Sequence, residues 1–320
     1  MRLNPNLFTE NEEKESTRAG FGKGILKAGK QNKNVVAITA DLAGSTKLSA
    51  FIKEFPDRFI QVGVAEQNLA TVASGLAHVG KIPFITSFAM FSPGRNWEQI
   101  RTTICYNNQN VKIVGSHAGI GVGPDGATHQ ALEDIAITRV MPNIQVIAPC
   151  DAIQAEKATI AIAKTKKPAY LRVNRQKSPI ITTKSTEFKI GKAQLFKDGS
   201  DVAIISCGPI IYEALLAAKE LEKKGISALV LNVHTIKPID KKEIIKAAKK
   251  TKAVVTVEDH QIHGGLGSAV AEVLAQNYPT RMEFIGIKDR FGESGSDKEL
   301  YKKFGLTYKH IIKAVKKVII

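Results

Sequence analysis

Short apolar runs alternate with helical patterns along most of this 320-residue chain, and this alternation limits its fold more than any other feature. An apolar run of about four to eight residues predicts a strand, and apolar residues spaced three and four apart predict a helix. Strands separated by helices pair in parallel, because each helix carries the chain back across a face of the sheet. The sequence therefore predicts an α/β fold.

The alternation falls into two blocks. Strands are expected at 35–38, 59–62, 83–86, 111–115, 145–148 and 168–173, and then at 201–207, 228–233, 253–257 and 282–287. We predict two consecutive three-layer α/β domains, the first with a mainly parallel sheet and the second smaller. The expected divisions are an N-terminal arm (1–13), a first domain (14–177), a linker (178–190) and a second domain (191–320).

Composition argues against several classes of protein. No apolar run approaches the ~18 residues of a membrane span, and the sequence opens with Asn, Glu and Lys, so we expect a soluble cytoplasmic protein without a membrane partner. Cys105, Cys150 and Cys207 lack CxxC spacing, which favours buried thiols over disulfides or a zinc site. The net charge of +16 suggests nucleic acid, but the lysines lack interleaved aromatic residues. A solvated surface that attracts small anions, and no nucleic-acid partner, is the better interpretation.

Glu66 lies where a predicted strand (59–62) meets a predicted helix (69–79), with Gly63 allowing the turn. Such junctions are at the carboxyl ends of strands, where ligands bind in α/β folds. An acid at a helix start also simply complements the helix dipole, so this stretch alone leaves both interpretations open.

Two further strand ends carry polar or aromatic groups. The loop from Asp41 to Thr46 places a carboxylate and two hydroxyls after the strand at 35–38, although Asp and Ser also serve as helix caps. Phe88 and Phe91 follow the strand at 83–86. They are either core residues or an aromatic wall for a flat ligand.

The glycine-rich loop at 116–130 is the most informative stretch by spacing alone. Four glycines and a proline hold His117, Asp125 and His129 outside the predicted helices and strands. Loops of this composition are seldom core, and imidazoles titrate near neutral pH, so the pattern favours a functional site. By contrast, Glu258 to Gly267 lacks the Lys-Ser/Thr pair of a phosphate-binding P-loop, which favours tight backbone packing there.

Several segments together resemble the pyrimidine-binding domain of transketolases. They are Asp41-Leu42-Ala43-Gly44-Ser45, Gly63-Val64-Ala65-Glu66-Gln67, Ser87-Phe88-Ala89-Met90-Phe91 and Asp125-Gly126-Ala127-Thr128-His129-Gln130. Leu171 to Gln176 also looks like this family, and Glu258 to Gly267 looks like its C-terminal domain. The resemblance implies a transketolase, which uses thiamine diphosphate to move a two-carbon ketol unit from a ketose phosphate to an aldose phosphate.

The resemblance also implies roles for individual residues. Glu66 would hydrogen-bond the aminopyrimidine ring of the cofactor and promote deprotonation of the thiazolium carbon. Phe88 and Phe91 would form a wall against the pyrimidine, and Asp41 would lie near the thiazolium. The substrate would be bound by guanidinium, hydroxyl, carboxylate and imidazole groups, with both histidines available for proton transfer. These groups belong to Arg18, Ser45, His117, Asp125, His129 and Arg175.

Two departures from the family pattern shape the prediction. Ser92-Pro93-Gly94 stands where many full-length transketolases have a further aromatic residue. The Gly-Asp-Gly motif with a later Asn, by which the family holds Mg²⁺ and the diphosphate, is absent. The resemblance therefore implies the C-terminal subunit of a split transketolase, with no metal ligands of its own. An N-terminal subunit would supply the Mg²⁺ ligands, and self-association would give an α2β2 assembly.

Three alternatives remain. Half of a 1-deoxyxylulose-5-phosphate synthase and the beta subunit of a 2-oxoacid dehydrogenase share the domain pair and the glutamate. His117 favours transketolase, because the synthase has an arginine at that place. A non-catalytic subunit with the same fold is the third alternative, and the presence of Glu66, Asp125 and His129 argues against it.

Overall fold

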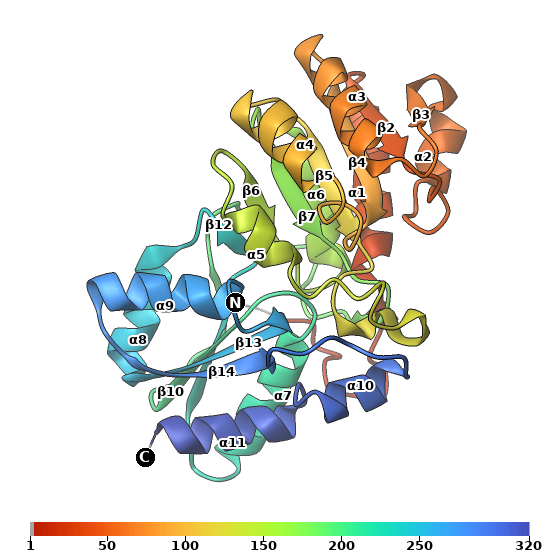
Figure 1. Cartoon of the computed structure of the whole chain (residues 1–320). Coiled ribbons are helices and arrows are strands. Elements are labelled where there is room, and N and C mark those ends of the chain that lie inside the picture. The colour runs from red at the N-terminus through yellow and green to blue at the C-terminus, as the bar shows by residue number, and fades with distance from the viewer. Residues whose placement is uncertain (1–2, 320) are drawn as a thin grey trace.

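The computed structural model describes residues 3–319, and its two large sheets are each covered by helices on both faces (Figure 1). The predicted three-layer α/β architecture is confirmed. The sheet of the first unit has the strand order β12-β6-β7-β5-β4-β2-β3 and is parallel except for β12. Its strands are β2 (Val35–Thr39), β3 (Phe59–Gln61), β4 (Ile82–Phe88), β5 (Lys112–Ser116), β6 (Gln145–Ile147), β7 (Ala169–Arg172) and β12 (Thr235–Lys237).

Alternating side chains of these strands divide between two helical layers. Val114 and Leu171 face a cluster with α1 (Thr17–Gln31), α2 (Ser49–Glu54) and α6 (Ala152–Ala163). Ile113 and Tyr170 face the opposite layer. That layer contains α3 (Glu66–His78), α4 (Trp97–Gln99), the π-helix η2 (Ile100–Tyr106) and α5 (Asp134–Arg139).

The second sheet has the order β14-β13-β10-β11-β9, with only β9 antiparallel. Its strands are β9 (Gln194–Lys197), β10 (Val202–Ser206), β11 (Ala228–Asn232), β13 (Ala253–Gln261) and β14 (Arg281–Ile287). Helices α7 (Ile211–Glu222) and α11 (Tyr308–Val318) cover one face, α8 (Lys241–Thr251) and α9 (Leu266–Asn277) the other, and α10 (Asp297–Lys303) precedes α11.

Several short elements were not expected from the sequence. Strand β12 comes from the second block of the chain, yet it pairs antiparallel with β6 and forms one edge of the first sheet. Within the expected linker, β8 (Ser178–Pro179) pairs with β1 (Lys14–Glu15) at the start of the expected first domain. Phe8 of the expected arm packs on Tyr212, with ring centroids 5.3 Å apart. The short 3-10 helices η1 (Pro56–Arg58) and η3 (Ile120–Asp125) were also unexpected. Each is too short to give a recognisable apolar period.

One apolar cluster joins the two units. It includes Leu69 and Ile104 of the first unit and Ile205, Leu231 and Val270 of the second. The three cysteines are buried thiols, as predicted. Within residues 3–319, no helix has the length and apolar character of a membrane span.

Candidate active site

Parallel pairing brings five strand ends to one edge of the first sheet. Asp41 follows β2, Glu66 follows β3, Phe88 ends β4, His117 follows β5 and Arg175 follows β7. The carboxyl ends of parallel strands are where ligands bind in open α/β sheets. The topology therefore gathers residues that are far apart in the sequence.

Glu66 is the first residue of α3 and is only 2% exposed. The hydroxyl of Ser87, the second-to-last residue of β4, donates to Oε1 of Glu66 at 2.9 Å. The side-chain amide of Asn96 donates to the backbone oxygen of Glu66 at 2.9 Å. No described residue donates to Oε2, so one oxygen of this fixed carboxylate is available to accept a hydrogen bond from a ligand.

The two phenylalanines form an aromatic group with the two histidines of the loop. Phe88 and Phe91 stack with ring centroids 6.3 Å apart. His117 lies 3.8 Å from Phe88, and His129 lies edge-on to Phe91 at 5.5 Å. Neither phenylalanine is fully buried, so both remain accessible to a flat ligand, as an aromatic wall requires.

Arg18 of α1 connects this group to the loop after β2. Its Nη1 donates to the carbonyl oxygen of Ser45 at 2.9 Å and lies 3.1 Å from Nε2 of His117. Nδ1 of His117 is 2.9 Å from the hydroxyl of Ser116. Burial, with Arg18, Arg175 and His129 nearby, lowers the pKa of His117 to about 3. The imidazole is therefore neutral at physiological pH.

The remaining loop residues lie beside this constellation. Arg175 forms an ion pair with Asp125 at 3.5 Å and donates to the carbonyl of Val122 at 2.9 Å. Nδ1 of His129 is 2.9 Å from the Thr128 hydroxyl. Both partners of the ion pair are partly exposed, so each can still reach a ligand.

Asp41 stands apart from the other predicted site residues. It is exposed, has a φ of +60°, and interacts with Gln61 rather than with Glu66 or the aromatic rings.

At Ser92-Pro93-Gly94, a Cβ on Gly94 would lie 1.8 Å from the Met90 carbonyl, so the turn is closed tightly against its own backbone. Where a further aromatic residue would be expected, the Arg95 guanidinium lies over the Phe91 ring, with its central carbon 5.8 Å from the ring centroid.

The second unit holds the histidine loop in place. Asp259 at the end of β13 accepts from the backbone N–H of Ile120 at 2.9 Å and from the hydroxyl of Tyr301 at 3.0 Å. Gly119 has a φ of +83°, and a Cβ there would lie 2.0 Å from Asp259 Oδ2. This close approach explains why the loop needs glycine at that place.

The segment from Glu258 to Gly267 is a packing element, as the sequence favoured. The Glu258 carboxylate accepts from the backbone N–H groups of Leu266 and Gly267 at 2.7 and 2.8 Å. It therefore occupies the position at the start of α9 where a phosphate would otherwise bind.

Two family models cover most of the chain. The model described as "Transketolase, pyrimidine binding domain" matches residues 13–180, and "Transketolase, C-terminal domain" matches residues 191–311. The chain belongs to the transketolase family. This confirms the resemblance drawn from the four ordered motifs, and the family depends on thiamine diphosphate.

Individual transketolase-family relatives match along nearly all of the chain. It is 49% identical over 301 residues to "Putative transketolase C-terminal section" of Methanocaldococcus jannaschii, covering 93% of this chain and 94% of that protein. It is 42% identical to "6-deoxy-6-sulfo-D-fructose transketolase subunit SqwH" of Clostridium sp. (strain MSTE9), covering 92% and 91%. A solved structure described as "Split gene transketolase, inactive beta4 tetramer" matches with a TM-score of 0.89 at 44% identity, covering 95% and 98%.

The site geometry fits part of thiamine diphosphate. A buried carboxylate with one open oxygen beside stacked aromatic rings is suited to a flat ring that carries an N–H donor. The described residues contain no group of three or more His, Cys, Asp or Glu side chains placed to hold a metal ion. The carboxylate and the aromatic rings thus suit the aminopyrimidine end of this transketolase cofactor.

Sequence reasoning missed the groups that orient the site. Ser87 and Asn96 contact Glu66, and Ser116 contacts His117. Asp259 holds the loop at Ile120. None of these four was predicted as a site residue. Only Ser87 left a signal. In a strand, neighbouring side chains point to opposite faces, so a serine just before Phe88 points toward the other side of the strand.

Proposed function

We propose that this chain is the catalytic C-terminal subunit of a two-subunit transketolase that transfers a ketol unit from a ketose phosphate to an aldose phosphate. The observation that carries the proposal is the buried Glu66 carboxylate, held by Ser87 beside the Phe88 and Phe91 rings. Thiamine diphosphate, when bound, supplies the nucleophilic carbon for this transfer.

Each residue then has a task that its position allows. Glu66 accepts an N–H of the cofactor's pyrimidine ring, and the two phenylalanines orient that ring. Neutral His117, together with His129, binds and moves protons at the substrate carbonyl and hydroxyls. Arg18, Ser45, Asp125 and Arg175 hold the substrate, with the guanidinium groups directed to its phosphate. Asp41 is proposed to border the thiazolium, although no described contact links it to the other site residues.

The proposal requires a second chain. The Gly-Asp-Gly motif is absent from the sequence, and no described cluster of side chains suits Mg²⁺. We propose that an N-terminal subunit holds Mg²⁺ and the diphosphate, and that the subunits assemble as α2β2 in the cytoplasm. The likeness to a beta4 tetramer supports self-association of this chain.

Transketolase is favoured over the synthase and dehydrogenase alternatives by His117. Its Nε2 faces Arg18 and its ring packs on Phe88. This position suits a neutral imidazole that contacts a substrate oxygen. One relative is named for a sulfo-sugar, 6-deoxy-6-sulfo-D-fructose.

Reconstitution tests the proposal. We expect the chain alone to transfer no ketol unit from xylulose 5-phosphate to ribose 5-phosphate. Transfer should appear when the N-terminal subunit, thiamine diphosphate and Mg²⁺ are added together. Rapid turnover by the isolated chain, or no turnover by the complete mixture, would contradict the proposal.

Glu66→Gln is the matched variant for this experiment. It keeps the size of the side chain but removes the carboxylate, so we expect the mixture to lose about 10²-fold or more in rate. Hydrogen exchange at the thiazolium carbon should slow in parallel. The double variant Glu66→Gln/Gln67→Glu adds a carboxylate at the exposed neighbouring position, and it should not restore the exchange rate. Unchanged exchange in Glu66→Gln would refute the role of this residue.

A further inference from the structure

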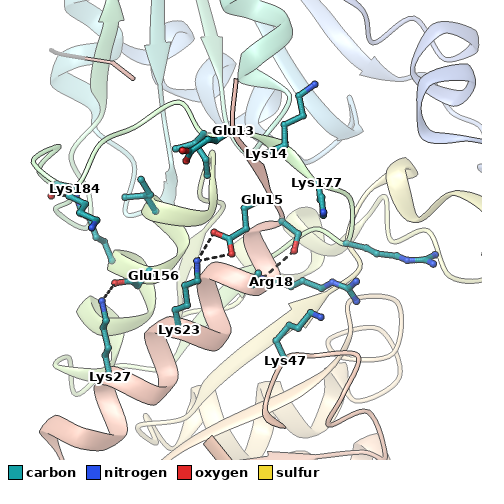
Figure 2. A pocket seen from close by; sticks show the side chains of 16 residues that line it. Glu13, Lys14, Glu15, Arg18, Lys23, Lys27, Lys47, Glu156, Lys177 and Lys184 are labelled. Atoms are coloured by element: carbon teal, nitrogen blue, oxygen red, sulfur yellow. Dashed lines mark hydrogen bonds and ion pairs between the residues drawn. The ribbon is translucent and has the colours of Figure 1, made fainter. Parts of the chain in front are cut away.

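An open groove of about 970 Å³ runs along α1 to the outer side of the candidate active site (Figure 2). Nine basic side chains and only three acidic ones line it. Arg18 and Arg175, proposed above to bind the substrate phosphate, both line it. The groove therefore extends the candidate active site rather than forming a separate one.

The basic residues of the groove differ in how their charges are balanced. Lys23 is paired with Glu15 at 2.7 Å, and Lys27 is paired with Glu156 at 2.5 Å. Lys47 has no carboxylate partner among the described residues, although it lines the same groove. Among the described residues, Lys157, Lys177 and Lys184 likewise form no ion pair with a carboxylate. What distinguishes Lys47 is its place on the loop that carries Ser45, the partner of Arg18.

Arg18 has an unused edge. Nη1 is occupied by the Ser45 carbonyl and His117, whereas Nε is buried and has no acceptor among the described residues. In a planar guanidinium, the Nε and Nη2 hydrogens point the same way and form the fork that binds phosphate. Burial and the neighbouring Arg175 lower the pKa of Arg18, as expected where two cations converge on a place for an anion.

The backbone fixes Lys47 against the helix that carries Arg18. Its φ is +65°, a conformation that a lysine seldom adopts. A Cβ on Gly22, one turn after Arg18, would lie 2.7 Å from the Lys47 carbonyl oxygen and 2.9 Å from its Cβ. The hydroxyl of Thr46 donates to the Leu42 carbonyl at 2.9 Å and anchors the loop. Figure 2 shows the Lys47 and Arg18 side chains extending in the same direction.

We propose that Lys47 is a substrate-binding residue that completes, with Arg18 and Arg175, a three-cation site for the terminal phosphate dianion of the sugar; this inference rests on the proposed function. Asp125 partly balances Arg175 at 3.5 Å, so Lys47 supplies the charge that the second negative charge of a phosphate needs. A sulfonate carries a single negative charge and gains less from a third cation, because Coulomb energy scales with charge. The site thereby selects phosphorylated over sulfonated sugars.

Steady-state kinetics of the reconstituted two-subunit enzyme test this inference with the variant Lys47→Gln. We expect the KM for ribose 5-phosphate to rise about tenfold, with kcat nearly unchanged, because an interaction with the remote phosphate is lost. The KM for an unphosphorylated acceptor, glycolaldehyde, should stay within twofold. The preference for a phosphate over its sulfonate analogue should fall, and Lys47→Arg should restore it.

Lys23→Gln is the matched control. It removes the same charge from the same groove, but from a lysine that is already paired, so the KM for ribose 5-phosphate should stay within twofold. An unchanged KM in Lys47→Gln, or an equal rise for glycolaldehyde, would overturn the inference.

A binding measurement separates this inference from the proposed function. Calorimetry with inorganic phosphate and the isolated chain should show about tenfold weaker binding by Lys47→Gln than by the natural chain, a difference of ~1.4 kcal/mol. If the reconstituted mixture transfers no ketol unit but this difference is found, only the proposed function fails. Equal phosphate binding by the two chains would reject the role of Lys47 whatever the activity.

Discussion

At the scale of single residues, His117 shows how a functional group is set by its neighbours. It is 3% exposed, has a φ of +58°, and lies between the Phe88 ring and the guanidinium of Arg18. Burial and positive neighbours both disfavour the imidazolium, which is why its pKa falls to about 3. The ring is therefore neutral near pH 7, and an anion bound beside Arg18 and Arg175 would raise its pKa.

This environment predicts a pH effect that can be measured on the isolated chain. Because the unfolded chain binds the proton near pH 6.5 and the folded chain only near 3, the free energy of unfolding should decrease as the pH falls between these values. NMR titration should find His117 neutral through most of this range. Arg18→Met should raise the midpoint of the His117 titration, because the Arg18 guanidinium is the second largest cause of the lowered His117 pKa.

Arg101→Gln, at an exposed position on η2, is the control for that titration and should leave the midpoint in place. A midpoint that does not move in Arg18→Met would show that the guanidinium does not act on His117. A midpoint near 6.5 in the natural chain would contradict the buried, cation-flanked environment itself.

At the scale of elements, the packing of α1 on α6 positions Arg18. Ser16 caps α1 by accepting from the Ala19 N–H at 3.3 Å. The glycines of α1 allow close helix contact: a Cβ on Gly20 would lie 2.0 Å from the Ala152 carbonyl oxygen. Because α1 cannot move away without displacing Arg18, packing and site geometry are coupled.

Gly20→Ala should destabilise the chain. The added methyl group must push α1 from α6, so we expect the free energy of unfolding to fall by about 2–3 kcal/mol in denaturant titrations. Gly75→Ala on α3 is the matched control, since no atom lies within 4 Å of its Cβ position. It should raise the stability by about 0.5–1 kcal/mol through helix propensity. Equal effects of the two substitutions would contradict the packing argument.

At the scale of the whole molecule, a buried polar network joins the two units beneath the histidine loop. Arg172 of β7 contacts the Asp134 carboxylate at 2.8 Å and donates to the Asp259 carbonyl at 2.8 Å. Tyr170 donates to the same Asp134 oxygen at 2.7 Å. Since the Asp259 side chain also binds Ile120, the second unit supports the loop although it supplies none of the proposed catalytic residues.

Arg172→Met should lower the free energy of unfolding by about 3–5 kcal/mol, because it leaves the buried Asp134 carboxylate without its counter-ion. The double variant Arg172→Met/Asp134→Asn removes both charges and should be more stable than Arg172→Met alone. Chemical denaturation measures both. A double variant less stable than the single one would show that the charge pair is not the main contribution of these residues.

Much of the fold was readable because local patterns and packing agree. The apolar runs at 35–38 and 228–233 became β2 and β11, and their near-continuous apolar character reflects burial on both faces. The spacing of apolar residues from 130 to 139 suits a helix, but α5 begins only at Asp134, because the Gln130 side-chain amide donates to the Ile120 and Glu293 carbonyls. These partners are distant in sequence, so no local pattern indicates them.

The sequence by itself determined the α/β alternation, the family and the types of chemical group in the candidate site, because these depend on periodicity and on short ordered motifs. The tertiary structure decided which groups meet. The packing of strands, helices and the two units placed Ser87 on Glu66, Arg18 on His117 and Asp259 under the loop, and it left Asp41 apart with Gln61. It also placed the unpaired Lys47 beside Arg18 and put β12 at the edge of the first sheet. Such contacts join residues separated by many positions, and only the packing of the complete chain brings them together.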